Sequence, residues 1–436
     1  MISRYRWRRF LAPTAGIRSA LLTCAVGLLI FLVGFAISFK ALIQPLIQET
    51  SGVWRDFLGR FIGREDLDTA NHVLGGGFLI LGFYFAYAGG RMVLQRVGEI
   101  LNPSLRGKIG DEFRRRQALA QGPRIVALGG GTGLSTLLRG LKNYSSNITA
   151  IVTVTDDGGS SGRLVQEMGI IPPGDMRNCL VALADAEKLM TDLFQHRFDK
   201  DAGSLSGHSI GNLLIAALVR QSDGDFEQAL KRASEVLAIR GRVVPSTLSH
   251  VRLRALMEDG SEVCGETKIV ESGRKISRIF LDPDEAEPHP EALEAIRDAD
   301  LIVIGPGSVY TSIIPNLLVP GVAEALSEAS AIKAYVCNVM TQPGESDSFT
   351  ASEHLVALQA NVEHRVCDFV LVNTGVPSQT AIEKYRESGQ HLVVADEDRI
   401  RGMGYKVVTG NLMSESDYVR HDPAHVAPIL MDLLER

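Results

Sequence analysis

Residues 124–141 read RIVALGGGTGLSTLLRGL, in which a short apolar strand runs into a series of glycines and then into a helix. Glycines let the backbone approach a phosphate group closely, and a helix N-terminus supplies free N–H groups and a partial positive charge. The stretch therefore predicts the first strand–loop–helix unit of an α/β fold. Its phosphate-binding residues are predicted to be Gly130, Gly131, Thr132 and Gly133, and a tight structural turn is the alternative explanation.

The spacing of these glycines argues against two common nucleotide-binding motifs. Leu134 occupies the position at which the dinucleotide fingerprint carries its third glycine, so NAD is not expected as a cofactor. The lysine that follows the glycines of a P-loop is missing from this stretch, which disfavours a Walker-type NTPase. The loop is thus expected to bind phosphate in another way.

Similar apolar runs recur along the rest of the chain. They are rich in Val and Ile and apolar on both faces, as expected for parallel strands covered by helices on both sides. The predicted strands are residues 148–155, 301–307, 334–340, 369–373 and 391–396, and the predicted helices include 135–141, 225–238, 291–297 and 353–361. Residues 251–281 alternate around a turn at Asp259 and Gly260, which predicts a small antiparallel excursion. The predicted fold class is α/β, a Rossmann-like and mostly parallel sheet.

The composition excludes several classes of protein. The chain has 436 residues, with 45 Lys and Arg against 51 Asp and Glu, which gives a formal net charge of −6. Without a strongly basic balance, nucleic acid is not expected as a partner. The 5 cysteines are scattered without a C-x-x-C pair, so neither a disulfide framework nor a zinc ribbon is expected.

The N-terminal part of the chain contains two long uncharged apolar runs, at residues 19–39 and 69–90. As a helix, the first run would reach about 31 Å, which matches the hydrocarbon thickness of a bilayer. Buried globular helices are one alternative. A cleaved signal peptide is another, but its apolar core would span only about 7–15 residues. We therefore predict a membrane anchor with two transmembrane helices in residues 1–118, followed by a nucleotide-binding domain in residues 119–436.

Arginines around the two runs determine the predicted orientation. Arg4, Arg6, Arg8 and Arg9 precede the first run, several more follow the second, and the loop between the runs is mixed in charge. By the positive-inside rule, both termini and the main domain are cytoplasmic, so the chain is expected in the cell membrane with the lipid bilayer as a partner. The arginine-rich residues 91–116 either contact anionic head groups or form a solvated linker.

A polar loop with the sequence TVTDDGGSSGRL, residues 153–164, follows the second predicted strand. Asp156 or Asp157 lies where a Rossmann acid would hold a ribose hydroxyl, and the pair is equally suited to hold Mg²⁺. Ser160 and Ser161 offer hydroxyl donors, and Arg163 offers a positive charge. A solvated turn is the alternative, since Asp and Gly are typical turn residues.

Two further polar loops precede predicted helices. In IPPGDMRN, residues 171–178, helix capping alone would explain Asp175, and Arg177 and Asn178 are more direct candidates for ligand contact. In LSGHSIGN, residues 205–212, His208 is a candidate acid/base group or phosphate contact, with Asn212 beside it. A purely structural histidine is the alternative.

Two more loops follow predicted strands, at residues 304–312 and 338–347. Gly305, Gly307 and Ser308 repeat the strand-then-glycine pattern of the first loop. Donors and acceptors suited to a base or a sugar come from Asn338, Thr341, Gln342 and Glu345. Each loop alone is equally consistent with an ordinary turn. Together, at the carboxyl ends of parallel strands, they are expected to face a common crevice.

Six motifs in this order resemble the YvcK-type gluconeogenesis-factor family: GGGTGLSTLLRGL, VTVTDDGGSSGRL, PPGDMRN, SGHSIGN, IGPGS and NVMTQPGE. The wider superfamily is similar to the phospholactate transferase CofD, which builds a deazaflavin coenzyme. The resemblance begins near Arg124, continues to the C-terminus and implies a Rossmann-like core. The membrane hairpin departs from the soluble members of the family.

The two branches of this superfamily imply different functions. The YvcK branch implies binding of UDP-sugars such as UDP-N-acetylglucosamine and a role in central carbon use and cell-wall morphogenesis. The CofD branch implies Mg²⁺-dependent transfer of a phospholactyl or phosphoenolpyruvyl group, with a guanine nucleotide as the leaving group. In the first case the domain is a nucleotide-sugar sensor, and in the second Asp157 and His208 are the candidate catalytic residues. The residue sequences of the motifs look closer to the YvcK branch, which favours the sensor. A homodimer is also expected.

Overall fold

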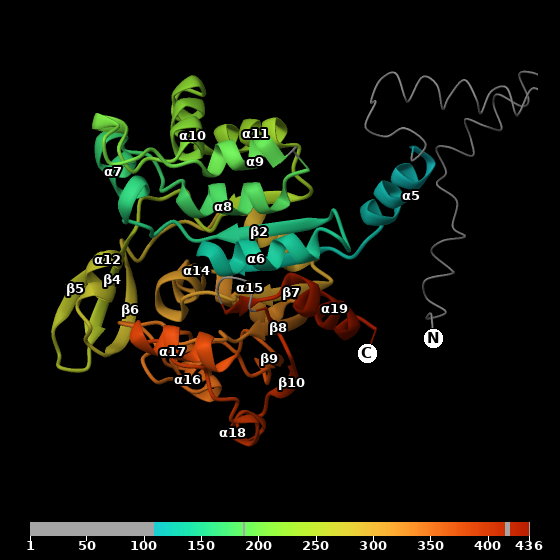
Figure 1. The fold of residues 1–436 in the computed structure, drawn as a ribbon, viewed down its shortest axis with the longest axis vertical. Helices are drawn as coiled ribbons and strands as arrows, with labels where there is room; N and C mark the ends of the chain where they lie inside the picture. Colours follow the sequence, from blue (N-terminus) through green and yellow to red (C-terminus); the bar gives the residue numbers. More distant parts are fainter. Residues whose placement is uncertain (1–108, 186–187, 415–418, 436) are drawn as a thin grey trace, which may run out of the picture. The chain divides into compact units, whose positions relative to one another are not determined.

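The computed structural model describes residues 109–185, 188–414 and 419–435, which Figure 1 draws in colour. Residues 119–436 form one unit, and its centre is a seven-stranded parallel sheet with the strand order β10-β9-β8-β7-β1-β2-β3. The strands are β1 (Ile125–Gly129), β2 (Ile148–Val152), β3 (Arg242–Pro245), β7 (Leu301–Ile304), β8 (Ile332–Val336), β9 (Phe369–Asn373) and β10 (Lys406–Gly410). Every residue of β1, β2 and β7 is buried, because helices cover both faces of the sheet.

The order of the strands locates the ligand crevice. From β1 the chain moves outward through β2 to β3, and it then returns to β7 on the other side of β1 before moving outward through β8, β9 and β10. Strand order therefore reverses between β1 and β7. In open α/β sheets, ligands bind outside the carboxyl ends of the strands at such a switch point.

The helices form two groups that flank the sheet. One group contains α6 and α8, which pack side by side, with α19 against α6; the other contains α13 packed against α15. The helices of the described residues are α5 (Ile109–Ala120), α6 (Gly131–Leu141), α7 (Gly159–Met168), α8 (Gly174–Leu183), α9 (Lys188–Gln195), α10 (Ile210–Gln221), α11 (Phe226–Leu237), α12 (Glu266–Glu271), α13 (Pro290–Asp298), α14 (Ile314–Leu318), α15 (Val322–Glu328), α16 (Ala351–Asn361), α17 (Gln379–Glu387), α18 (Glu397–Gly402) and α19 (Pro423–Leu433).

The predicted antiparallel excursion is confirmed as a three-stranded sheet of β4 (Arg252–Met257), β5 (Glu262–Cys264) and β6 (Ile276–Asp282), with α12 between β5 and β6. Figure 1 shows these elements grouped at one side of the domain. The inward side chains of β4 and β6 belong to the main hydrophobic core; Leu253 and Ile279, for example, are 0% and 1% exposed. The excursion is therefore built into the domain as one of its walls.

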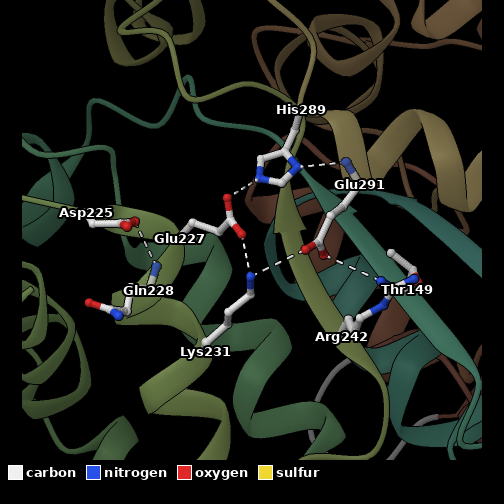
Figure 2. A network of polar contacts seen from close by, with 8 residues as sticks. All are labelled: Thr149, Asp225, Glu227, Gln228, Lys231, Arg242, His289 and Glu291. Carbon is white, nitrogen blue, oxygen red and sulfur yellow. Dashed lines mark hydrogen bonds and ion pairs between the residues drawn. The ribbon is translucent and has the colours of Figure 1, made fainter.

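A network of charged side chains ties the sheet edge at β3 to two helices (Figure 2). Lys231 of α11 lies 2.5 Å from Glu227 and 3.4 Å from Glu291 of α13, and Arg242 of β3 lies 3.5 Å from Glu291. His289 lies 3.5 Å from Glu227 and accepts a hydrogen bond from the Glu291 N–H through Nδ1, which caps α13. Such a network braces an edge strand with charges, and charged edges also oppose pairing with foreign strands.

The strand prediction fails in three places. Residues 391–396 were expected to form a strand, but Leu392 makes only an isolated bridge with Met340. Asp396 accepts hydrogen bonds from the Ser352 backbone N–H and from the Thr350 hydroxyl at the start of α16, so this apolar segment serves as a connection. The two edge strands, β3 and β10, were missed because partly exposed strands lack a continuous apolar run.

The two predicted membrane spans, at residues 19–39 and 69–90, lie outside the described residues. Within residues 109–185, 188–414 and 419–435, no single helix is both long and apolar enough to cross a membrane. One bent pair of helical segments, Val309–Leu318 and Val322–Glu328, is long and apolar enough only when its two members are counted together, and the angle between them is 81°.

Candidate functional site

Two glycine-rich loops press against each other at the switch point. A Cβ atom on Gly133, in the first turn of α6, would lie 2.4 Å from the carbonyl oxygen of Pro306, which follows β7. Gly131 has a φ of +63° and Gly305 a φ of +77°, values that L side chains rarely adopt. The loops after β1 and β7 can therefore meet only because glycine occupies these positions.

A cavity of about 430 Å³ opens beside these loops. From the predicted site it includes Thr132, Gly133, Gly307, Asn338 and Thr341. One wall of the cavity comes from α17 and from the short strand β12 (Arg420–His421), which pairs with β11 (Met413–Ser414). That wall contributes Lys384, Tyr385, Arg420 and His421. The lining thus combines glycine backbone with two cationic side chains and an aromatic ring, a combination suited to a nucleoside diphosphate.

Several predicted contacts in this cavity hold the loops rather than presenting free groups. Asn338 accepts a hydrogen bond from the Gly307 N–H at 3.1 Å and donates to the Gly307 carbonyl at 2.8 Å. Gln342 donates to the Ser308 hydroxyl at 2.7 Å, and the Thr341 hydroxyl accepts from the His391 N–H at 2.9 Å. Asn338 and Gln342 therefore fix the shape of the loop after β7, and Thr341 ties the loop after β8 to His391.

His421 is a neutral member of the cavity wall. Its Nε2–H donates to the Cys337 carbonyl at 3.0 Å, and burial lowers its pKa to about 4. The ring consequently stays uncharged at neutral pH, with Nδ1 as an acceptor. The positive charges of this wall come from Lys384 and Arg420.

Asp175 occupies part of the helix N-terminus that the sequence assigns to phosphate. Its Oδ2 lies 2.6 Å from where a Cβ on Gly130 would be, and its carboxylate accepts a hydrogen bond from the Gly131 N–H. Burial, reinforced by the negative charge of Asp156, raises the pKa of Asp175 to about 7. The Gly131 N–H is thus directed toward a carboxyl group, whereas Thr132 and Gly133 line the cavity.

The adjacent carboxylates of Asp156 and Asp157 are directed to different partners. Asp156 accepts from the Gly158 N–H at 3.0 Å. Asp157 accepts from the Thr267 N–H at 2.9 Å and from the Thr267 hydroxyl at 2.7 Å, which anchors α12. Among the described residues, no group of three or more His, Cys, Asp or Glu side chains is arranged to hold a metal ion. Mg²⁺ binding by this pair stays a prediction.

A chain of buried polar side chains links α7, α8 and α10. His208 Nδ1 lies 3.0 Å from the Ser160 hydroxyl, which accepts from the Asn212 amide at 3.0 Å. Arg177 donates to the Ser209 hydroxyl and, at 2.8 Å, to Asn178. Burial and the nearby Arg163 charge lower the pKa of His208, which keeps the imidazole neutral at pH 7. The predicted candidates His208, Ser160 and Asn212 are therefore in direct contact, with Arg163 bonded to the Ser206 carbonyl.

Among these hydrogen-bonded side chains of α7, α8 and α10, two buried atoms have no hydrogen-bond partner in the described residues: Arg177 Nε and Asn212 Oδ1. The aliphatic stem of Arg177 runs across the start of α10, where a Cβ on Gly211 would lie 2.7 Å from its Cδ. A buried polar atom without a partner is costly, so such atoms commonly mark a place where water or a ligand completes the bonding.

Sequence reasoning missed Lys384, Tyr385, Arg420, His421 and Glu266. The first four are on α17 and β12, far along the chain from any glycine loop, and carry no recognisable motif. Glu266 begins α12 in the excursion. Burial and the charges of Asp156 and Asp175 raise the pKa of Glu266 to about 9, and the adjacent Thr267 is hydrogen-bonded to Asp157.

The chain is similar to known proteins over most of its length. Residues 125–413 match the family described as 2-phospho-L-lactate transferase CofD. The gluconeogenesis factor of Bacillus subtilis is 49% identical over 318 residues, which are 73% of this chain and 100% of that protein. A protein of Nostoc sp., provisionally given the same name, is 43% identical over 430 residues, which are 98% of this chain and 92% of the relative. The crystal structure of a UPF0052 family member from Bacillus halodurans is 48% identical and superimposes with a TM-score of 0.68, covering 71% of this chain and 99% of that one.

Proposed function

This chain belongs to the CofD family and, within it, to the gluconeogenesis factors, and from that premise we propose that it is a regulatory protein that binds a nucleotide sugar. The proposed ligand is of the UDP-N-acetylglucosamine type. The proposed role is control of gluconeogenic carbon use and of cell-wall morphogenesis, in line with the branch that the motifs resemble.

The cavity at the switch point is the observation that carries this proposal. Its volume of about 430 Å³ lies within the range of about 300–1,000 Å³ typical of small-molecule sites. We place the diphosphate between Gly133 and Gly307 on one side and Lys384 and Arg420 on the other. The ring of Tyr385 then offers a surface on which a base can stack. The sugar extends past the glycine loops toward Asp156 and Asp175.

A second candidate function is Mg²⁺-dependent transfer of a phospholactyl or phosphoenolpyruvyl group from a nucleoside-diphosphate donor. The contact between Ser160 and the neutral His208 favours it, because a neutral imidazole can accept a proton from an attacking hydroxyl. Mg²⁺ would supply charge neutralisation at the diphosphate, with Asp156 as a candidate ligand. This candidate is the weaker one because Asp157, the other predicted ligand, is bonded to Thr267.

We further propose that residues 1–118 anchor the chain in the cell membrane, with the main domain in the cytoplasm. The two uncharged runs and their arginine-rich flanks support this placement. The Nostoc relative aligns with 98% of this chain, whereas the Bacillus subtilis protein aligns with 73%, so the family contains proteins both with and without a counterpart of this region.

Thermal unfolding of the protein titrated with UDP-N-acetylglucosamine tests the proposal. A ligand at 100 times its dissociation constant adds about 2.7 kcal/mol to the free energy of unfolding, which gives a clear rise in melting temperature. We expect Arg420→Gln to remove most of that rise. Arg297→Gln, a control on the exposed surface of α13, should leave it unchanged. A flat response of the folded wild-type protein would refute the proposal, and guanine-nucleotide donors would be tried next for the transferase.

A further inference from the structure

His421 lines the cavity at the switch point, and one edge of its ring is held in place. Its Nε2 lies 3.0 Å from the carbonyl oxygen of Cys337, a residue that is 0% exposed. A carbonyl oxygen only accepts, so the proton of the neutral ring is on Nε2 and Nδ1 carries a lone pair. The two nitrogens point in diverging directions, so Nδ1 is directed away from the Cys337 carbonyl. His421 therefore gives the cavity wall a hydrogen-bond acceptor in a fixed orientation.

A fixed acceptor discriminates between ligands in a way that an amide does not. Gln390 also lines the cavity, but an amide can turn over and offer either its oxygen or its NH₂ group to a ligand. The His421 ring cannot turn over without losing the bond from Nε2 to Cys337. His421 therefore distinguishes a ligand group that donates a hydrogen bond from a group that accepts one.

This acceptor is unsuited to the diphosphate. Phosphate oxygens carry lone pairs and would be repelled by the lone pair of Nδ1. Protonation of the ring would turn Nδ1 into a donor, but burial lowers the pKa of His421 to about 4. Lys384 and Arg420 in the same wall supply positive charge for the phosphates. His421 is thus suited to a part of the ligand that carries an N–H or O–H group.

The position of Tyr385 indicates which part of the ligand that is. The Tyr385 hydroxyl donates to the Val419 carbonyl at 3.5 Å, and Val419 lies two residues before His421 in the chain. Tyr385, Val419 and His421 all line the cavity. A base stacked on the Tyr385 ring therefore lies beside the segment that carries His421. On its pairing edge, uracil has an N3–H donor, whereas N3 of cytosine carries a lone pair.

We infer that His421 selects the base of the ligand: its Nδ1 accepts the N3–H of uracil and rejects the N3 lone pair of cytosine. This inference rests on the proposed binding of a nucleotide sugar and names the residue that reads its base. A site built around one hydrogen bond disfavours an analogue that lacks the donor, because the acceptor is then left without a partner. Adenine, which has a lone pair at N1, is rejected for the same reason.

UDP and CDP test the inference, because they share the ribose and the diphosphate and differ only at N3 and C4 of the base. We expect the full chain, in detergent, to bind UDP at least about tenfold more tightly than CDP in a calorimetric titration, equivalent to about 1.4 kcal/mol. His421→Phe keeps a ring without an acceptor, and His421→Gln replaces the fixed acceptor by an amide that turns over. Each should reduce the ratio to about threefold or less by weakening UDP binding. His425→Gln, at an exposed position of α19, should leave the ratio unchanged.

A UDP analogue methylated at N3 gives a measurement that needs no variant. It lacks the N3 proton, so the wild-type protein should bind it as weakly as CDP, and binding as tight as that of UDP would overturn the inference.

The other outcomes separate the inference from the function on which it rests. Equal binding of UDP and CDP by a wild-type protein that binds UDP-N-acetylglucosamine would overturn the base selection and leave nucleotide-sugar binding intact. An unchanged ratio in folded His421→Phe and His421→Gln proteins, or equal weakening of UDP and CDP, would remove His421 from the selection and overturn the inference as stated. If neither UDP nor UDP-N-acetylglucosamine binds, the proposed function itself fails, and the inference fails with it.

Discussion

Replacement of Asp175 by Asn should change how the stability of the domain depends on pH. In the folded protein the pKa of Asp175 is raised from 3.8 to about 7. Below pH 4 the carboxyl is neutral in both the folded and the unfolded chain. Between pH 4 and 7 it stays protonated when folded but ionises when unfolded, so folding becomes less favourable as pH rises. Stability tied to this group is therefore present at low pH and lost as pH rises through about 7.

The size of this effect follows from the shift. A difference of about three pKa units at about 1.36 kcal/mol each gives about 4 kcal/mol as an upper value. Asp175 retains some exposure to solvent, which screens part of the interaction, so we expect about 2 kcal/mol. Asn cannot ionise but still accepts the Gly131 N–H. At pH 8 the variant should therefore be the more stable protein by that amount, and at pH 4 the two should match.

Urea unfolding of the wild-type and Asp175→Asn proteins at pH 4, 6 and 8 measures this difference. The test can use residues 119–436, because the Bacillus subtilis relative aligns over its whole length with 73% of this chain. The control is Asp223→Asn, in the exposed turn between α10 and α11. Parallel pH profiles for the wild type and Asp175→Asn would show that Asp175 ionises normally in the folded state and would refute the reasoning.

Three other predictions rest on the fold and a fourth on the sequence. Gly133→Ala should lower the free energy of unfolding by about 1–3 kcal/mol in urea unfolding and weaken UDP-N-acetylglucosamine binding, because its Cβ would lie 2.4 Å from the Pro306 carbonyl oxygen. Gly402→Ala, with no atom within 4 Å of its Cβ, is the control, and equal effects of the two would contradict the prediction. Asp157→Ala should cost about 1 kcal/mol through loss of the Thr267 bonds while ligand affinity in calorimetry changes little; loss of Mg²⁺-dependent binding would instead show a metal ligand. Glu291→Gln should cost less than about 1 kcal/mol, with the loss shrinking in high salt, because its partners Lys231 and Arg242 are exposed; a larger loss would mean that the brace is a principal support of the domain. The full chain should stay in the membrane fraction after a high-salt wash, and a chain without residues 1–118 should not; recovery of the full chain in the supernatant would count against the predicted hairpin.

The local pattern of the sequence was sufficient for the core of the fold. Apolar runs followed by glycines predicted parallel strands with their loops at one edge, and the structure confirms β1, β2, β7, β8 and β9. The alternation around Asp259 and Gly260 predicted the antiparallel excursion, which is also confirmed. These features are legible because burial on both faces, or on one, imposes a period on neighbouring residues. The edge strands were not predicted, and the strand predicted at residues 391–396 did not form, because the surroundings of these segments, more than their own composition, decide their structure.

The candidate site likewise contains some residues that the sequence identified and others that only the structure placed. The sequence by itself determined the glycine loops, because the positive φ of Gly131 and of Gly305 is a local backbone conformation that only glycine adopts readily. Only the tertiary structure decided the rest. It brings Arg420 and Glu266 to loops that are far away in sequence, and it directs Asp157 to Thr267 and Asn338 to Gly307. A polar side chain has the same chemistry in any loop, and its role depends on which partner lies within hydrogen-bond distance, which packing between distant segments alone establishes.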